Sequence, residues 1–514
     1  MRKLAPALTA LALLLPAAGA AGQAAVPALP GSVSQGVEFK GNIPINGSVG
    51  ANFKTYADGK TYMFVTGALG TAKFDPGLAG GLNYGGLWVY DITTDPASPA
   101  LVAHLPMPHY ESEDVSIGGD RLLISGDGTQ GGSNLVVVDI ADPTLPTVEG
   151  VINMNVADEG HTSTCIQDCR FAWVAGGSTL KVIDLDGLYD VDPAHGTVPA
   201  VSAQSKTVEL GAMKKQKQFG WAVHDVQVDQ AGIAWVVGGN GTVGFDVRPG
   251  HYGLSNALNP TLVATTGNDA LNSGGSGGLG PDASTVNDFI HHNTYRPNAD
   301  KFEPRTDANL DDAGLRPGEK VLITEEDIWS RTTLGTTRGG CATQGQFQVW
   351  QVKQYEGAHT DGATKFLGWW ETEYNGLLDQ GRLPSDDVVA SEGFCSAHYF
   401  DTQQGSGNLT AIAWYAQGTR LLDTSDPAHI KQVGYFLAPD STVWATYFSP
   451  TDKNVIYTLD HERGIDVLQI TPGGSVAKRT KVRAPILKRW FRKTQSDVSY
   501  KAGPVFGWVC PLVV

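Results

Sequence analysis

Short apolar runs separated by turn residues dominate the pattern of this chain. The runs are rich in β-branched and aromatic side chains, and Gly, Pro, Asp or Asn residues follow most of them. Such runs predict β-strands that end in tight turns. Apolar positions at helical spacing are almost absent. We therefore expect an all-β protein.

One of these runs recurs along the chain. Examples are LWVYDI, LVVVDI and LKVIDL, and most copies are followed by a turn with Pro or Gly. Another pair of β runs precedes each copy, and several copies continue into a fourth run. Four short strands in each of seven units predict a single seven-bladed β-propeller. The copies lie at 86–108, 133–154, 178–187, 241–250, 345–352, 418–439 and 463–474.

The N-terminal segment resembles a missing fourth strand. SVSQGVEFKGNIPI (32–45) is similar to the fourth strands PTVEGVINM and IKQVGYFLAP, whereas the last unit ends with its third strand at 464–470. We expect residues 36–45 to complete the last blade, which would remove an exposed sheet edge. The alternative is a free N-terminal arm. Long loop inserts are expected at 250–288, 297–320 and 371–394.

Histidines recur in the first strand of the predicted units. First strands of a propeller line its central channel, so side chains at equivalent positions form a ring. Alignment on the hairpin that follows each first strand places four histidines and one glutamate in this ring. In the order of the units, the position holds Asn52, Glu113, His161, His224, His291 or His292, His398 and Thr446.

The composition of this ring indicates a metal site. Neutral imidazoles suit Cu, Zn and Fe, and a carboxylate compensates the charge of the ion. We expect one transition metal ion (Cu, Zn or Fe) bound by histidines of the ring together with Glu113. The alternative is a water-filled polar channel, because clustered imidazoles disfavour one another's protonation. Strand alternation turns Asp225 away from the channel, so we expect it to be a structural partner.

The turns after the second strands return to the face that carries the ring. Their acidic and imidazole side chains could orient the metal ligands or act as a general base. The alternative is ordinary solvated loop charge. These rim residues are Asp127, Glu325, Glu326, Asp327, Asp460 and His461, and His109, just upstream of Glu113, should lie at the same rim.

The LWVYDI, LVVVDI and LKVIDL segments, with the D-P-x-x-P turns that follow the first two, resemble the LVIVD-repeat proteins. The resemblance covers nearly the whole mature chain and implies an exported bacterial β-propeller without a well-defined activity. The seven-blade layout with inner histidines is also similar to the selenium-binding protein/methanethiol oxidase family. That second likeness rests on architecture and histidine placement, and it implies a metal-dependent, copper-linked oxidase.

The beginning of the chain indicates export. MRKLAPALTALALLLPAAGAAG has a basic start, an apolar run and small residues at its end, which predicts a secretory signal peptide at 1–21. The alternative is a retained N-terminal anchor. No later segment supplies the ~20 apolar residues of a membrane span. We expect a secreted or extracytoplasmic protein, the cell surface included, with the propeller at 32–474 and a tail at 475–514 that packs on or straps it.

The net charge excludes some classes of binding partner, and the cysteines indicate disulfides. A net charge of −16 argues against nucleic acid and anionic membranes. In an exported chain cysteines can form disulfides, and Cys165 and Cys169 could bridge a tight hairpin. Cys341 with Cys395 is a second candidate pair, although Cys510 could replace either partner.

Known catalytic motifs do not decide the function. The sequence has no strand–elbow–helix GxSxG motif, no P-loop and no HExxH motif, and GGSGGLG (274–280) has no predicted helix after it. Two functions stay open. One is a metal-binding propeller that supports redox or hydrolytic chemistry on a small molecule at the histidine face. The other is a non-catalytic extracellular or cell-surface scaffold for a protein ligand. We expect a monomer.

Overall fold

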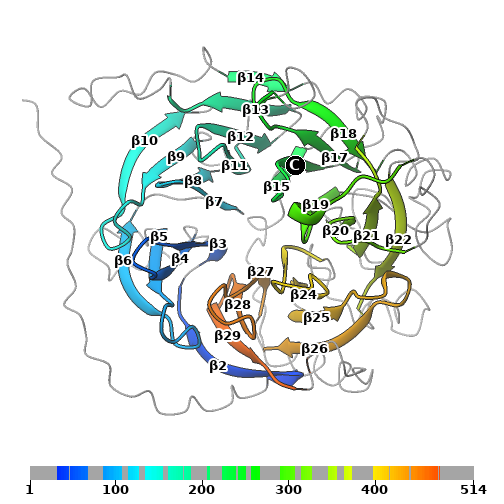
Figure 1. The fold of residues 1–514 in the computed structure, drawn as a ribbon. Coiled ribbons are helices and arrows are strands. Elements are labelled where there is room, and N and C mark those ends of the chain that lie inside the picture. Colours follow the sequence, from blue (N-terminus) through cyan, green and yellow to red (C-terminus); the bar gives the residue numbers. More distant parts are fainter. Residues whose placement is uncertain are drawn as a thin grey trace, which may run out of the picture.

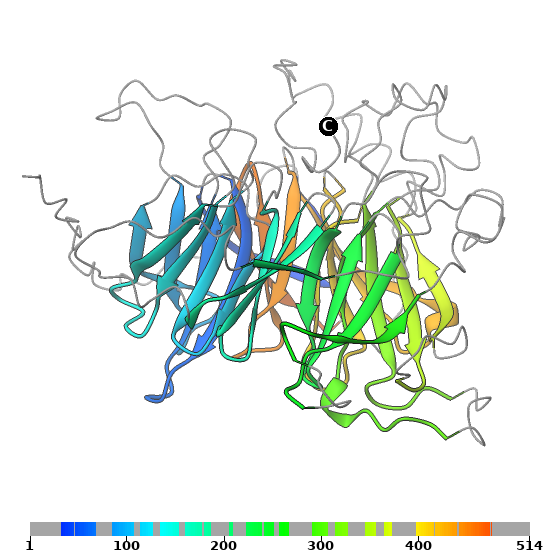
Figure 2. The same cartoon turned by 90° about the horizontal axis from the view of Figure 1, so that it is seen from above.

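Seven antiparallel sheets stand around a central axis, and together they form a β-propeller (Figure 1). Seen edge-on, the sheets lie side by side as a disc (Figure 2). The computed structural model describes residues 32–45, 47–67, 85–106, 114–126, 134–153, 160–176, 179–186, 205–208, 223–238, 241–250, 256–266, 290–306, 314–326, 345–355, 364–372, 397–415, 417–438, 441–472 and 474.

Each blade is built on four strands, counted from the channel outward, and the sixth blade has a fifth. The innermost strands are β3 (Ser48–Thr55), β7 (Val115–Gly118), β11 (Thr162–Ile166), β15 (Val223–Val228), β19 (Ile290–Tyr295), β23 (Phe400–Thr402) and β27 (Val443–Phe448). The second strands are β4 (Thr61–Gly67), β8 (Arg121–Gly126), β12 (Phe171–Gly176), β16 (Ile233–Gly238), β20 (Lys320–Glu326), β24 (Leu409–Ala413) and β28 (Val455–Asp460).

The outer halves of the blades follow the same pattern. The third strands are β5 (Gly86–Asp91), β9 (Asn134–Asp139), β13 (Thr179–Asp184), β17 (Gly241–Asp246), β21 (Phe347–Val352), β25 (Thr419–Asp423) and β29 (Gly464–Ile470). The fourth strands are β6 (Ala100–Pro106), β10 (Thr147–Asn153), β14 (Ser205–Val208), β18 (Thr261–Thr265), β22 (Thr364–Trp370), β26 (Lys431–Leu437) and β2 (Val37–Ile43). The expected all-β, seven-bladed fold is confirmed.

The N-terminal segment closes the ring of blades. Strand β2 pairs antiparallel with β29 and completes the last blade, as the sequence predicts. The preceding strand β1 (Val33–Gln35) adds a fifth strand to the sixth blade, next to β26, which the sequence did not predict. The chain passes from one blade to the next at Gly36, whose φ is 71°. A Cβ atom there would lie 2.5 Å from the carbonyl oxygen of Val433, so only glycine fits without a backbone shift.

The hydrophobic core consists of layers between neighbouring blades. Side chains of the third and fourth blades form one such layer, and those of the fourth and fifth form another. Trp173, Trp235, Trp350, Trp414 and Trp444 are all fully buried. Burial of each large apolar side chain contributes roughly 1.5–3 kcal/mol to folding. These layers fix the blades relative to one another, and they therefore position the inner strands around the channel.

A disulfide joins Cys165 and Cys169 across the β11–β12 hairpin, as predicted. Cys169 and the two residues before it have positive φ angles of 61°, 55° (Gln167) and 52° (Asp168). Cys341 and Cys395 lie outside the described residues, and so do the predicted signal peptide, the C-terminal tail and most of the long inserts. Within the described ranges, no helix is long and apolar enough to cross a bilayer.

Candidate metal centre

A β-bulge at the start of the first strand shapes the channel. In β15 the register shifts on either side of His224, so this residue has no direct partner in β16. A bulge bends the strand and re-aims the extra side chain. The bulged residue is His292 in β19, Trp444 in β27 and Val49 in β3. These four residues are therefore equivalent.

Two more histidines occupy the same position in the third and sixth blades. The backbone N–H of His161 donates to the oxygen of Ala175, and that of His398 donates to the oxygen of Ala413. In the third blade, Thr162 follows His161 and pairs with Ala175, just as Asp225 follows His224 and pairs with Val237. In the sixth blade, the pairing of Phe400 with Ile412 continues the same register. Four adjacent blades thus place a histidine at one equivalent position. In the fifth blade, where the sequence left two alternatives, that residue is His292.

The predicted ring is wrong in two blades. Trp444 and Val49 hold the positions that the sequence alignment assigned to Thr446 and Asn52. The first hairpins of these two blades are longer than that of the fourth blade. An alignment that counts residues backward from the hairpin turn therefore ends at a position between the turn and the bulge.

The four equivalent histidines lie side by side in blade order, and all are fully buried. Nε2 of His161 lies 3.1 Å from Nε2 of His224. The ring centroids of His224 and His292 are 4.0 Å apart, and those of His292 and His398 are 3.9 Å apart. The four imidazoles form a continuous arc along one side of the channel. We call these four residues the histidine arc.

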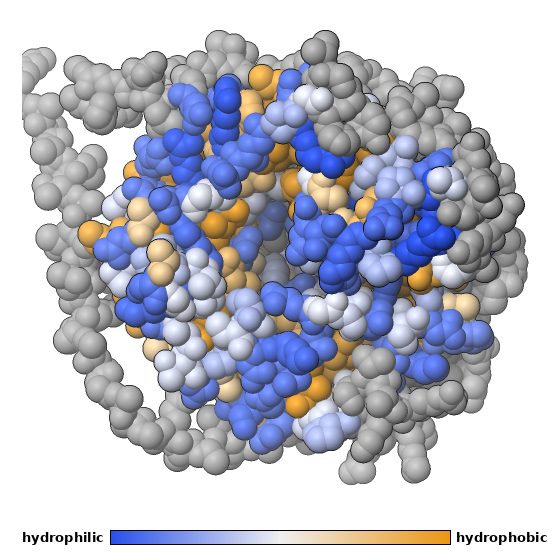
Figure 3. All heavy atoms as spheres, viewed as in Figure 1, coloured by the Kyte–Doolittle hydropathy of each residue, from blue (hydrophilic) through white to orange (hydrophobic). Residues whose placement is uncertain are grey.

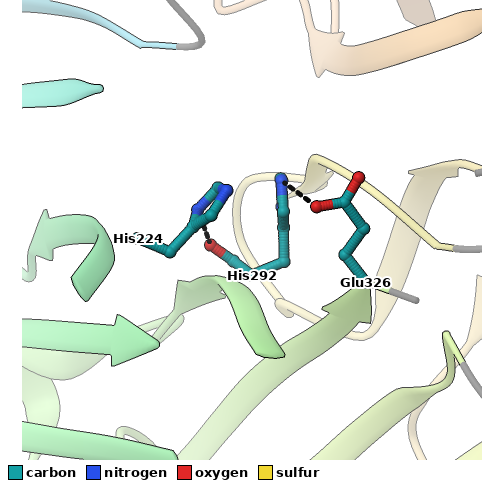
Figure 4. Close-up of side chains that lie close together, drawn as sticks. All are labelled: His224, His292 and Glu326. Carbon is teal, nitrogen blue, oxygen red and sulfur yellow. Dashed lines mark hydrogen bonds and ion pairs between the residues drawn. The ribbon is translucent and has the colours of Figure 1, made fainter. Parts of the chain in front are cut away.

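Glu326 joins the arc from the end of β20. Its Oε2 atom lies 3.6 Å from Nε2 of His292, and its Oε1 atom lies 4.0 Å from Nε2 of His398. The hydroxyl of Tyr415 donates to Oε1. One ligand atom from each of His224, His292 and Glu326 lies within 4.8 Å of the others (Figure 4). This cluster could hold a metal ion.

Backbone carbonyls fix the tautomers of two histidines. Nδ1 of His224 lies 3.1 Å from the oxygen of His292, and Nδ1 of His398 lies 2.6 Å from the oxygen of Trp444. A carbonyl oxygen only accepts, so Nδ1 carries the proton and Nε2 holds the lone pair. His161 Nε2–H then donates to Nε2 of His224. The lone pairs that a metal ion needs are thus held toward the cluster.

His291 and Glu325 form a separate pair behind the arc. Nδ1 of His291 lies 2.7 Å from Oγ1 of Thr242, and its Nε2 lies 3.9 Å from Oε1 of Glu325. Gln348 donates to the same carboxylate oxygen. His291 corresponds to Val223 in the register of β15 and β19. It is therefore placed beside a different carboxylate from that of the arc.

Two further predicted site residues that the structure describes, His461 and Asp460, make other contacts. The ring of His461 packs on Trp444 with 5.5 Å between centroids, and burial lowers the pKa of its imidazole to about 3. Asp460 accepts hydrogen bonds from Ser441 and from the backbone of Glu462. Glu113, His109, Asp127 and Asp327 lie outside the described residues.

Asp225 has the structural role that the sequence predicts. Its carboxylate accepts the backbone N–H of Val226 at 2.6 Å. It also accepts the side-chain amides of Gln227 at 3.1 Å and of Asn293, in the next blade, at 2.9 Å. Asp225 thus joins the first strands of the fourth and fifth blades and holds both bulged histidines in register.

Three residues near the arc were missed by the sequence analysis. Trp444 of the seventh blade, Tyr415 of the sixth and Val49 of the first form an apolar cluster. The ring of His398 lies 4.7 Å from that of Trp444 and 4.8 Å from that of Tyr415. The polar arc therefore adjoins an apolar wall. No motif marks these positions, and only the bulge register identifies Trp444.

The centre of one face of the disc is hollowed, and many hydrophilic residues surround it (Figure 3). No protein-family model and no curated protein matches the chain. Solved structures show a broad likeness. The β-propeller domain of Cps50 (Swd1) from Myceliophthora thermophila is 10% identical, with a TM-score of 0.49 over 85% of this chain and 100% of that one.

Two further solved structures show the same level of likeness. The periplasmic gluconolactonase PpgL of Pseudomonas aeruginosa is 15% identical, with a TM-score of 0.45 over 78% of this chain and 92% of that one. The WD40 repeats of RRP9 are 8% identical, with a TM-score of 0.45 over 84% of this chain and 96% of that one. Such distant likenesses carry no argument about function.

Proposed function

We propose that this propeller binds one transition metal ion (Cu, Zn or Fe) in its channel, with His224, His292 and Glu326 as ligands. His161 and His398 flank this trio, and Nε2 of His398 offers one further lone pair. The observation that carries the proposal is the convergence of these three ligand atoms within 4.8 Å of one another. They come from the inner part of two neighbouring blades, which is the arrangement expected for a site and not for scattered core histidines.

The spacing fits a metal ion. Three atoms within 4.8 Å of one another lie at most about 2.8 Å from a common centre, and zinc–imidazole and zinc–carboxylate bonds measure about 2.0–2.2 Å. A movement of less than about 1 Å by each side chain would therefore complete the coordination. The nitrogen-rich donor set favours Cu, Zn or Fe over Mg and Ca, which prefer oxygen ligands.

Tyr415 and the backbone supply the outer support of this site. Ligating groups in metalloproteins are oriented by hydrogen bonds from their surroundings. Here the hydroxyl of Tyr415 orients Glu326, and the carbonyl oxygen of His292 orients His224. These contacts prepare the donors before any ion binds.

A second function is favoured by the burial of the donors. His224 and His292 are fully buried, and Glu326 is 1% exposed. Structural metal sites are closed, whereas catalytic sites keep a position open for water or substrate. This favours an exported, LVIVD-like binding scaffold whose metal ion fixes the blades. Redox or hydrolytic chemistry would need an exchangeable ligand position in the same cluster. The Cys165–Cys169 disulfide is consistent with an extracytoplasmic location.

Metal analysis of the purified mature protein tests the proposal. After dialysis against Cu, Zn or Fe salts, about one ion should remain per chain, and His292→Gln should lower the affinity by at least about tenfold. His429→Gln is the matched control, because His429 is exposed and pairs with the likewise exposed Asp426. Circular dichroism checks that each variant folds. Absence of uptake with all three metals, or equal uptake by both variants, contradicts the proposal.

A further inference from the structure

A cavity of about 390 Å³ lies between the fifth and sixth blades, away from the histidine arc. His292 stands at the beginning of β19, whereas the cavity is lined by Pro297 and Asn298, which follow the end of that strand. The turn between β19 and β20, in green, reaches the lower edge of Figure 2. The cavity is thus on the opposite face of the disc from the arc.

The lining of this cavity is cationic. Lys301, Arg316 and Lys320 all contribute to it. Among the described lining residues none carries a carboxylate. The chain as a whole has a net charge of −16. Three cationic side chains around one cavity are therefore unusual for this protein. Clefts lined by one sign of charge concentrate ions of the opposite sign.

Lys320 is anchored at the base of the cavity without an ion pair. Its Nζ donates to the oxygen of Gly407 at 3.0 Å and to Oδ1 of Asn408 at 2.7 Å. It also lies 3.2 Å from the oxygen and the hydroxyl of Thr424. All of these acceptors are neutral, and no ion pair within 4.0 Å involves Lys320 among the described residues. The side chain is 8% exposed, and burial lowers the pKa of its ammonium group to about 8.

Neutral hydrogen-bonding groups surround these cations. The amide of Asn298 donates to the oxygen of Ser406 at 3.3 Å, and Asn298 also accepts a bond from Lys301 at 2.8 Å. Gly318 and Gly407 have positive φ angles of 78° and 62°. A Cβ atom on Gly407 would lie 2.5 Å from the ring of Pro297. The two turns therefore approach each other closely, and the cavity has fixed walls.

We propose that this cavity binds a small organic polyanion, a phosphate monoester or a tricarboxylate, through Lys301, Arg316 and Lys320. Its volume is in the range of small-molecule pockets, about 300–1,000 Å³. An arginine offers paired donors that match phosphate and carboxylate oxygens. Lys320 attracts the anion through its positive charge and not through a hydrogen bond, because its protons are already donated to neutral oxygens. This site is independent of the channel metal.

Calorimetric titration with three probes tests this site. Citrate, glucose 6-phosphate and inorganic phosphate are titrated at pH 7 in low salt. Binding of citrate alone identifies a tricarboxylate site, and binding of glucose 6-phosphate alone identifies a phosphate-ester site. Affinity should fall as NaCl is raised. Absence of binding by both organic probes at 10 mM, or binding that inorganic phosphate matches, overturns the proposal.

A variant pair locates the binding. Lys301→Gln with Arg316→Gln should weaken binding by at least about tenfold, because two charge-assisted contacts are lost. Lys60→Gln is the control, since Lys60 is an exposed lysine in the corresponding first hairpin of the first blade. Equal affinity in the double variant and in the control places the anion elsewhere and overturns the proposal.

Proton uptake reports on Lys320 without replacing it. An anion beside this ammonium group would raise its pKa, so binding at pH 8 should take up about half a proton. Titrations in two buffers of different ionisation heat measure this uptake. Binding without uptake at pH 8 would show that the anion does not reach Lys320, which contradicts the proposed placement.

Discussion

Hydrogen bonds to neighbouring groups determine what each imidazole of the histidine arc can do. The carbonyl oxygens of His292 and Trp444 hold the protons of His224 and His398 on Nδ1. Their Nε2 atoms are therefore lone-pair donors at the channel. Metal binding would replace the hydrogen bond between His161 and His224. The chain thus exchanges one weak contact for a coordinate bond.

Replacing Tyr415 can separate its role in orienting Glu326 from the role of its ring in packing. Tyr415→Phe removes the hydroxyl that donates to Glu326 but keeps the ring beside Val49 and Trp444. We expect a 10–100-fold loss of metal affinity, which is typical when an outer hydrogen bond to a ligand is removed. The urea midpoint of the metal-free protein should change little. Metal titration with unchanged affinity would show that Glu326 is not a ligand.

Asp460 predicts a pH dependence of stability. Burial raises the pKa of its carboxyl to about 7, from 3.8 in the unfolded chain. Between these values the folded state binds more protons, so stability falls as the pH rises from about 4 to about 7. Asp460→Asn resembles the neutral acid. We expect it to be as stable as the native protein near pH 4 and more stable by roughly 1–3 kcal/mol at pH 8.

Urea unfolding at both pH values measures this difference. Asp58→Asn is the control, because Asp58 is an exposed residue of the β3–β4 turn. A free energy difference between Asp460→Asn and the native protein that stays constant with pH would show that the Asp460 carboxyl titrates normally.

At the scale of strands, the repeat was predictable and the bulge was not. Short apolar runs mark the third strands, and turns with Pro or Gly follow most of them, because buried side chains and tight turns constrain these residue types. A bulge leaves no such signal, since it depends on the pairing of two strands. The sequence therefore identified His161, His224 and His398 but not Trp444. It placed Glu326 at the rim, although the end of β20 brings it into the cluster.

The closing strand predicts a sharp effect at Gly36. Gly36→Ala puts a Cβ atom 2.5 Å from the oxygen of Val433 at a φ of 71°. The chain would have to shift where β1 leaves the sixth blade and β2 enters the seventh. We expect a loss of roughly 2–3 kcal/mol in the free energy of unfolding.

Gly59→Ala provides the comparison for this effect. Gly59 has a φ of 83°, but nothing lies within 4 Å of the place of its Cβ atom. It should cost only about 1 kcal/mol, from backbone strain alone. Equal losses in the two variants would show that the close approach at the blade junction does not contribute.

At the scale of the whole molecule, the candidate metal centre lies where several blades meet. His224 belongs to the fourth blade, whereas His292 and Glu326 belong to the fifth. The third and sixth blades contribute the flanking histidines. Each pair of neighbouring blades also shares its own apolar layer. The propeller should therefore fold without metal, and an ion would add stability by joining blades that already pack.

This arrangement predicts that metal raises the melting temperature but is not required for folding. Free metal at 100 times the dissociation constant should add about 2.7 kcal/mol to the free energy of unfolding, because it binds only the folded site. Chelation should return the melting curve to that of the metal-free protein. His224→Gln with His292→Gln should remove the shift, whereas His429→Gln should keep it. A metal-dependent shift of equal size in the double variant and in the control would mean that the ion binds outside the channel. A protein that unfolds on chelation would mean that the apolar layers alone do not hold the blades together.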